Sequence, residues 1–187
     1  GYSSAASDVY KRQMQGLVGD LLTLARMDEE EAAAQSGAAR PALEEVDLSD
    51  VIEGEVLQFE SVAFERGVKL ESQVEPGIEL PGSEQRLRRL AGALIDNACK
   101  YVDDGGAVDV ALSRAGKQVK LEVRNTGAPI SPEDLPHVFD RFYRADKART
   151  GGVGGHGLGL AIARAIAEEH GGTLTASSTQ AEGTAFT

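Results

Sequence analysis

Two kinds of hydrophobic periodicity occur in this chain without a regular strand-helix repeat, and this combination most constrains the fold. Apolar residues recur at helical spacing in residues 84–102, whereas apolar and polar residues alternate in residues 108–112 and 119–123. A turn at Ala115-Gly116 separates the two alternating runs, which predicts an antiparallel hairpin. We therefore expect an α+β fold, a two-layer sandwich in which a mixed, mostly antiparallel sheet carries helices on one face.

Further helices and strands are predicted on both sides of this central part. Asp47 or Ser49 can cap a helix that ends near Gly67, and Ser83 can cap the helix of residues 84–102. The remaining predicted elements are strands at 68–71, 78–80, 173–177 and 184–187, and a helix at 158–170. Together with the hairpin, these elements make one domain of residues 47–187.

The N-terminal part of the chain divides into three segments. Residues 1–13 match no periodic pattern, so we expect a non-native or frayed segment there. Residues 14–34 are predicted to form one long helix that precedes the domain, and its broad apolar stripe requires a partner helix. Small and polar residues followed by Pro41 indicate a linker at residues 35–46.

Composition argues against several functional classes. The formal net charge of -11 argues against a nucleic-acid partner, because contact with a phosphate backbone requires clustered Lys and Arg. Cys99 is the single cysteine, so no internal disulfide can form, which fits a reducing cytoplasm. No apolar run approaches the ~20 residues that a membrane helix needs. We therefore expect a cytoplasmic domain.

One face of the helix at residues 84–102 carries side chains suited to a ligand. The spacing of Asn97, Lys100 and Tyr101 sets them on a common face, apart from the core-facing leucines. An amide oxygen can coordinate Mg²⁺, an ammonium can meet a phosphate, and an aromatic ring can stack on a base. The alternative is an ordinary solvated helix face.

A glycine-rich segment precedes the last predicted helix. Its glycines are Gly151, Gly152, Gly154, Gly155, Gly157 and Gly159. Glycine lets backbone N–H groups approach phosphate oxygens closely, and the N-terminus of the following helix favours an anion. The Lys-Ser or Lys-Thr ending of a Walker loop is absent, as is the context of a dinucleotide fold. The pattern predicts a triphosphate-binding loop, with a flexible linker as the alternative.

Five short motifs follow one another in the C-terminal half of the chain. In chain order they are LIDNACKY at 94–101, NTGAPI at 125–130, FDRFYRAD at 139–146, GHGLGL at 155–160 and GTAF at 183–186. They resemble the asparagine box, the first glycine box, the phenylalanine box, the second glycine box and the closing glycine-threonine motif of sensor histidine kinases, a branch of the ATPase superfamily shared with gyrase, the heat-shock chaperone and mismatch-repair proteins. Residues 17–28 resemble the end of the second helix of the family's dimerisation hairpin.

The resemblance implies a site for ATP and Mg²⁺ and assigns roles within it. Arg144 and Lys100 would be the catalytic residues, with Arg144 reaching the terminal phosphate, and Asn97 would be the Mg²⁺ ligand. The implied nucleotide-binding residues are Asn97, Lys100, Tyr101, Asn125, Gly127, Ile130, Phe142, Arg144, Gly155, His156, Gly157, Leu158, Gly159, Leu160 and Thr184. Phe139 and Phe142 are also expected to anchor a lid segment against the sheet.

Two residues depart from the family pattern, and a third separates branches of the superfamily. Asn125 stands where the family has an aspartate that accepts a hydrogen bond from adenine, and Pro129 replaces a glycine. The carbonyl oxygen of Asn125 can accept the same hydrogen bond, without charge assistance. Ala93 stands where water-splitting members carry a glutamate base, so ATP hydrolysis is not expected as the main reaction.

The resemblance implies transfer of the ATP γ-phosphate to a histidine of an upstream helical hairpin, for relay to the receiver domain of a response regulator. None of His137, His156 and His170 lies in the His-Glu/Asp-x-x-x-Pro context of the phosphoacceptor. The parent protein would be a homodimer through its hairpin, anchored in the bacterial inner membrane. The alternatives are a degenerate nucleotide-binding scaffold, favoured by Asn125 and Pro129, and a serine kinase acting on an anti-sigma partner.

Overall fold

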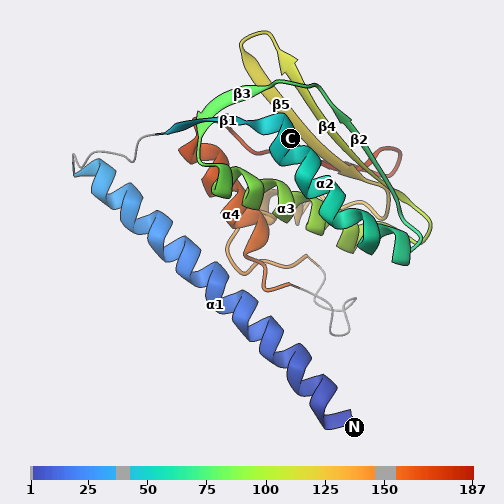
Figure 1. The fold of residues 1–187 in the computed structure, drawn as a ribbon. Coiled ribbons are helices and arrows are strands. Elements are labelled where there is room, and N and C mark those ends of the chain that lie inside the picture. The colour runs from blue at the N-terminus through green and yellow to red at the C-terminus, as the bar shows by residue number, and fades with distance from the viewer. Residues whose placement is uncertain (1, 37–42, 146–154) are drawn as a thin grey trace.

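A five-stranded sheet organises the chain, of which the computed structural model describes residues 2–36, 43–145 and 155–187. The strand order is β2-β4-β5-β7-β6, where β2 is Lys69–Val74, β4 Ala107–Ala115, β5 Gln118–Asn125, β6 Ala176–Thr179 and β7 Gly183–Phe186. β2 pairs with β4 in parallel, and the other neighbours pair antiparallel. One face of the sheet is covered by α2 (Leu48–Glu65), α3 (Glu84–Tyr101) and α4 (Gly159–Glu169) (Figure 1). The predicted α+β sandwich is confirmed.

The predicted caps of the first two covering helices have different outcomes. Asp47 caps α2, because its carboxylate accepts a hydrogen bond from the N–H of Asp50 at 3.1 Å. Ser49 instead lies buried inside α2, where its hydroxyl bonds to backbone outside the helix. Ser83 occupies the N-cap position of α3 but its side chain makes no capping bond, so that prediction is wrong. The backbone N–H of Ser83 donates to Nε2 of His170, which joins α3 to the end of α4.

The N-terminal helix and the linker differ from the prediction. α1 spans Tyr2–Gln35, so residues 2–13 are helical rather than irregular. These residues lack an apolar stripe but also lack proline, and helix propagation from an existing helix requires only acceptable propensity. Within the predicted linker, β1 (Glu44–Asp47) pairs antiparallel with β3 (Glu79–Gly82). Only Val46 of β1 is fully buried, and a single apolar residue is too short a pattern to predict a strand.

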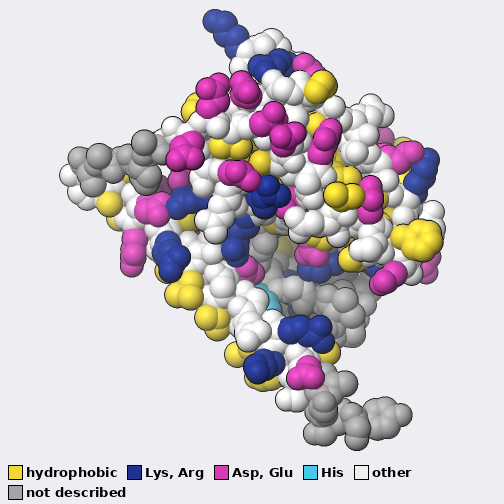
Figure 2. Space-filling model, in the orientation of Figure 1, with side chains coloured by type: hydrophobic (Ala, Val, Ile, Leu, Met, Phe, Trp, Pro, Cys, Tyr) yellow, Lys and Arg dark blue, Asp and Glu magenta, His cyan; other side chains and the backbone are white. Residues whose placement is uncertain are grey.

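α1 contacts the domain through one face and leaves another face exposed. Leu24 is buried and α1 packs against α4, while Asp20 and Glu30 pair with Arg89 and Arg86, each at 2.6 Å. The exposed apolar side chains of α1 include Met14, Val18, Leu21 and Leu22, and yellow side chains follow this edge of the helix in Figure 2. None of the described helices, α1 included, combines the length and the apolar character that crossing a bilayer requires.

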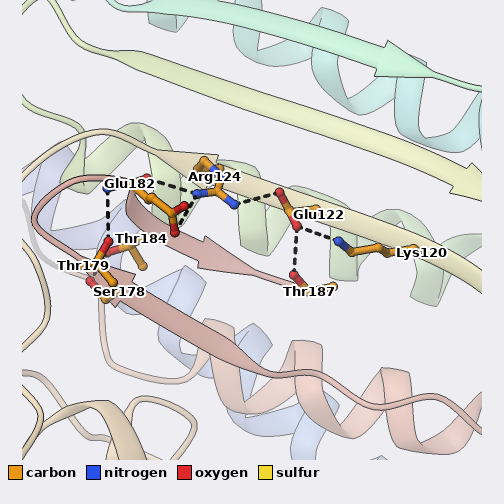
Figure 3. Close-up of polar contacts among 8 residues, drawn as sticks. All are labelled: Lys120, Glu122, Arg124, Ser178, Thr179, Glu182, Thr184 and Thr187. Carbon is orange, nitrogen blue, oxygen red and sulfur yellow. Dashed lines mark hydrogen bonds and ion pairs between the residues drawn. The ribbon is translucent and has the colours of Figure 1, made fainter.

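The two faces of the sheet differ in character. The face under the helices forms the core, whose largest fully buried side chains include Phe186, Ile52, Ile78, Leu94, Ile95 and Ile162. The other face carries ion pairs: Glu122 accepts from Lys120 at 2.9 Å and from Arg124 at 3.1 Å (Figure 3). The hydrogen bond from Lys120 and, second to it, the one from Arg124 lower the pKa of the Glu122 carboxyl. A site between helices and sheet would therefore lie on the helix-covered face.

Candidate functional site

The C-terminal end of α3 carries three of the predicted site residues. Its apolar stripe faces the core and leaves Asn97 half-buried, with Lys100 and Tyr101 exposed. The ammonium of Lys100 pairs with Asp96 one turn earlier, at 2.5 Å. A Cβ added to Gly155 would lie 3.4 Å from Nζ of Lys100. The structure thus brings the asparagine motif and the second glycine motif into contact.

The first glycine motif approaches the same end of α3. Gly127 has φ +137°, and a Cβ there would lie 2.9 Å from the carbonyl oxygen of Tyr101. Only a residue without a side chain allows this approach of the two backbones. Thr126 strengthens the junction by donating a hydrogen bond to Asp103 at 2.5 Å. Three motifs far apart in the sequence therefore meet at the end of α3.

Asn125, the predicted reader of adenine, lies at the end of β5 and is only 3% exposed. Its side-chain Nδ2 donates to the carbonyl oxygen of Thr126 at 2.9 Å. This bond specifies the orientation of the amide, because a reversed amide would set two acceptor oxygens against each other. Oδ1 is then the acceptor that remains for a ligand, as the prediction requires.

Thr184 and Ile130 are joined by a residue that the sequence did not single out. Ser178 on β6 accepts from the N–H of Ile130 at 2.9 Å, and its hydroxyl bonds to the hydroxyl of Thr184 at 2.8 Å. Figure 3 shows Ser178 and Thr184 on adjacent strands. Thr184 also pairs with Asn125 across β7 and β5. Ser178 lies 48 residues from Ile130, and no short motif could have indicated it.

Gly183, next to Thr184, fills a position that excludes any side chain. Its φ is +73°, and a Cβ would lie 2.1 Å from the carbonyl oxygen of Asn125. The glycine of the closing motif is thus required for the β5–β7 pairing that brings Thr184 beside Asn125.

The two phenylalanines of the phenylalanine motif have different environments. Phe139 packs edge-on against Phe186, with ring centroids 6.0 Å apart, and it contacts the sheet as predicted. Phe142 is 58% exposed, so its predicted role as a second anchor against the sheet is wrong. It has φ +65°, and its N–H donates to the carbonyl oxygen of Gly157 at 2.9 Å. The backbone of Phe142, rather than its ring, connects this motif to the second glycine motif.

The two arginines of the same motif also lie in different environments. Arg141 forms a two-pronged ion pair with Asp28 of α1, at 2.9 and 2.7 Å, which lowers the pKa of the Asp28 carboxyl and raises that of Arg141. Arg144 is half-buried two residues after Phe142. Tyr143 stands between Phe142 and Arg144, and its hydroxyl donates to Asp134. The sequence offered no signal for the contacts of Asp28 and Asp134.

The second glycine motif leads into α4. Leu158 occupies the N-cap position and is fully buried, so its side chain belongs to the core and only its backbone can face a ligand. A leucine cannot cap a helix, and the first N–H groups of α4 receive no side-chain cap from it. His156 and Gly157 are half-buried, Gly159 is exposed, and Leu160 packs partly against the core. The predicted residues Gly151, Gly152, Gly154 and Asp146 lie outside the described residues.

Two comparisons with the sequences of known proteins find similar proteins. Residues 82–187 match the model of the family described as histidine kinase-, DNA gyrase B-, and HSP90-like ATPase. The chain is 34% identical over 177 residues to the sensor histidine kinase RppB of Synechocystis sp., covering 94% of this chain and 37% of RppB. The chain thus spans little more than a third of the length of this curated relative.

Solved structures are similar to the chain as well. The mycobacterial sensor histidine kinase MprB is 31% identical, with a TM-score of 0.66 over 77% of this chain and 93% of that one. The full-length ShkA, in complex with AMPPNP, is 26% identical, with a TM-score of 0.73 over 92% of this chain and 34% of that one. The likeness to ShkA covers nearly all of this chain, including part of α1.

Proposed function

This chain belongs to the histidine kinase-, DNA gyrase B-, and HSP90-like ATPase family, and we propose that it binds ATP with Mg²⁺ between α3, the two glycine motifs and the start of α4. The observation that carries the proposal is the convergence on the end of α3, where Lys100 meets Gly155 and Gly127 meets Tyr101. We call Asn125, Ser178, Gly183 and Thr184 the base end of this site. We call Lys100, Phe142, Arg144, Gly155 and Gly157 its phosphate end.

The residues present fit a nucleotide and its metal. Gly127 and Gly157 take positive φ values at positions where a Cβ would strike backbone atoms 2.9 and 2.8 Å away. Glycine at both positions lets neighbouring backbone segments pack closely against each other around the proposed site. The half-buried amide of Asn97 supplies the oxygen that Mg²⁺ prefers. When bound, Mg²⁺ would neutralise charge on the phosphate oxygens.

Each end of the site has a separate task in the proposed reaction. Oδ1 of Asn125 accepts a hydrogen bond from the amino group of adenine and orients the base. Lys100 and Arg144 bring positive charge to the phosphates, and Arg144 stabilises the charge that spreads over the transferred phosphoryl group. Ala93 offers no base for a water molecule, which favours phosphoryl transfer over hydrolysis.

We propose that the acceptor is a histidine of a helical hairpin to which α1 contributes, as in sensor histidine kinases. Neutral imidazole is nucleophilic and needs no base from this domain. The exposed apolar stripe of α1 supports a partner helix and, through it, a homodimer. The phosphoryl group would then pass to the receiver domain of a response regulator. We place this domain on the cytoplasmic side of a membrane-anchored parent protein.

The proposal is tested by the metal dependence of nucleotide binding. Replacing Asn97 with Ala removes the proposed Mg²⁺ ligand, so we expect the affinity for Mg-ATP to fall about 10- to 100-fold. Binding of metal-free ATP should remain unchanged. Isothermal titration calorimetry with and without Mg²⁺ measures both values.

The matched control is Asn97→Asp, which keeps an oxygen at the same position and should retain Mg-ATP binding within about tenfold. Circular dichroism of both variants should match that of the natural chain, because Asn97 is not a core residue. A natural chain that binds no Mg-ATP, or an Asn97→Ala variant with undiminished affinity, contradicts the proposal.

A further inference from the structure

Tyr143 forms a hydrogen-bonded unit with two residues of the loop after the first glycine motif. Its hydroxyl donates to Oδ1 of Asp134, and Oδ2 of Asp134 accepts from the hydroxyl of Ser131 at 2.7 Å. The N–H of Asp134 returns a bond to Oγ of Ser131 at 3.1 Å. The hydrogen bond from Tyr143 and, second to it, the one from Ser131 lower the pKa of the Asp134 carboxyl. The bond to Asp134 raises the pKa of the Tyr143 hydroxyl. Both carboxylate oxygens of Asp134 are thus used within the protein.

The backbone of Tyr143 contacts the second glycine motif. A Cβ added to Gly157 would lie 2.8 Å from the carbonyl oxygen of Tyr143. The preceding residue, Phe142, donates its N–H to Gly157 and holds φ +65°, a conformation that costs a non-glycine residue free energy. An unfavourable backbone angle persists only where surrounding contacts impose it. Tyr143 supplies such contacts directly before Arg144.

The hydrogen-bonded unit of Tyr143, Asp134 and Ser131 is also connected to the base end. Ser131 follows Ile130, whose N–H bonds to Ser178, and Ser178 bonds to Thr184. Covalent and hydrogen bonds therefore connect Thr184 to Arg144 through Ser131, Asp134 and Tyr143. Within this connection, Ser131, Asp134 and Tyr143 have not been assigned to the nucleotide.

We propose that Tyr143 is a positioning residue whose bond to Asp134 holds Arg144 at the terminal phosphate of ATP. This inference rests on the proposed function, because it takes Arg144 as the residue that meets the terminal phosphate. Tyr143 contacts no reacting atom in this role. It acts only through Arg144, so it contributes to the binding of ATP and not to the binding of ADP, which lacks the terminal phosphate.

The test compares the affinities of the chain for Mg-ATP and Mg-ADP by calorimetric titration. The preference is the ratio of the affinity for Mg-ATP to the affinity for Mg-ADP. The Arg144→Ala variant serves as the reference, because it shows how far this ratio falls when the arginine is removed. We expect Tyr143→Phe, which removes one hydroxyl, to reduce the preference about two- to tenfold, corresponding to one hydrogen bond. Its affinity for ADP should stay within about twofold of the natural chain. A purely structural role would weaken both nucleotides equally.

Four further variants distinguish a positioning role from a purely structural one. Asp134→Ala should reproduce the effect of Tyr143→Phe, whereas Asp134→Asn keeps an acceptor for the phenol and should retain most of the preference. Tyr10→Phe makes the same chemical change at an exposed residue of α1 and should alter neither affinity. The double variant of Tyr143→Phe and Arg144→Ala should match Arg144→Ala alone, because Tyr143 acts through Arg144.

The inference is overturned if Tyr143→Phe keeps the natural preference, if it weakens ATP and ADP alike, or if the double variant is worse than Arg144→Ala. A natural chain that binds no Mg-ATP refutes the proposed function and this inference together. A natural chain that binds ATP and loses its preference only with Arg144→Ala refutes the inference alone.

Discussion

The base end and the phosphate end of the proposed site are held by different kinds of structure. At the base end, Asn125 and Thr184 are 3% and 5% exposed and lie in paired strands. At the phosphate end, Lys100 and Phe142 are exposed, and Phe142 and Arg144 lie outside helices and strands. Among the described residues, a backbone hydrogen bond from Phe142 to Gly157 joins the phenylalanine motif to the second glycine motif.

This difference suits the two tasks of the site. A base that is recognised by its hydrogen-bonding edge requires acceptors at exact positions, and a sheet supplies them before the ligand arrives. A phosphoryl group that must leave requires contacts that can be made and released, and weakly packed segments open at low free-energy cost. We therefore expect substitutions at the base end to affect folding and those at the phosphate end to affect ligand contacts.

The largest expected effect is at the base end, where Gly183→Ala should destabilise the fold. A Cβ there would lie 2.1 Å from the carbonyl oxygen of Asn125, in addition to the cost of φ +73°. Gly116→Ala is the matched control, because Gly116 has φ +65° with no atom within 4 Å of an added Cβ. We expect Gly116→Ala to lower the free energy of unfolding by about 1–2 kcal/mol and Gly183→Ala by at least about 1 kcal/mol more.

Urea denaturation of the two glycine variants measures this difference. Equal losses for Gly183→Ala and Gly116→Ala would mean that the strands of the base end separate easily enough to admit a side chain. The comparison between a tightly packed base end and an exposed phosphate end would then fail.

A smaller effect is expected for Asn125→Asp at the base end. This substitution should change the affinity for ATP and the free energy of unfolding in opposite directions. A carboxylate accepts more strongly from the adenine amino group and repels the carbonyl of guanine, so ATP should bind about five- to tenfold more tightly and GTP more weakly. The same change removes the donor that Nδ2 offers to the carbonyl oxygen of Thr126, so the free energy of unfolding should fall by about 1 kcal/mol.

Paired ATP and GTP titrations at one salt concentration, with urea denaturation, test both parts. Gln118→Glu makes the same amide-to-acid change at an exposed residue of β5 and should alter neither affinity. If the ratio of ATP to GTP affinity does not rise in Asn125→Asp, Asn125 does not read the base.

The smallest effect is expected where the phosphate end is joined to α1 by Asp28 and Arg141. Both side chains are half exposed, so Asp28→Asn should speed hydrogen exchange of the α1 amides by only about two- to fivefold. Because Arg141 lowers the pKa of Asp28, the pair contributes fully above the ordinary carboxyl pKa and is lost as the pH falls through the lowered value. The variant should therefore differ from the natural chain at pH 7 and resemble it in strong acid.

Glu29→Gln is the matched control for this pair, since Glu29 forms no ion pair within the part of the chain that the structure describes. Hydrogen exchange measured by mass spectrometry should show no change for Glu29→Gln, and the effect of Asp28→Asn should shrink as salt is added. An effect of Asp28→Asn that persists in high salt would show that more than an exposed ion pair holds α1 to the phosphate end.

Local sequence patterns predicted most of the fold but not its exceptions. The hairpin of β4 and β5 has alternating residues over 108–112 and 119–123, and α3 repeats its apolar stripe over five turns. β1 has one buried residue, and residues 2–13 have no apolar stripe, so periodicity carries no information there. The helix and the strand form at these places because neighbouring structure supports them.

The residues of the proposed site divide in a similar way, into those that belong to short sequence motifs and those identified only by their contacts in the structure. Asn97, Lys100, Asn125 and the glycine motifs could be named in advance, because each consists of neighbouring residues with distinctive chemistry. Ser178, Asp134 and Asp28 carry no such signature, since serines and aspartates occur commonly on any surface. The partners Thr184, Tyr143 and Arg141 lie 6, 9 and 113 residues away along the chain.

The sequence by itself determined the chemistry available to this protein. It specified an amide that can coordinate a metal, two cations that can meet phosphates, glycines that allow close backbone approach, and no base at residue 93. The tertiary structure decided which of these groups meet. It directed the ring of Phe142 outward, oriented the amide of Asn125, and joined Tyr143 to Asp134. The physical reason is that residue type sets what a side chain can bind, whereas long-range packing sets which partners lie within bonding distance.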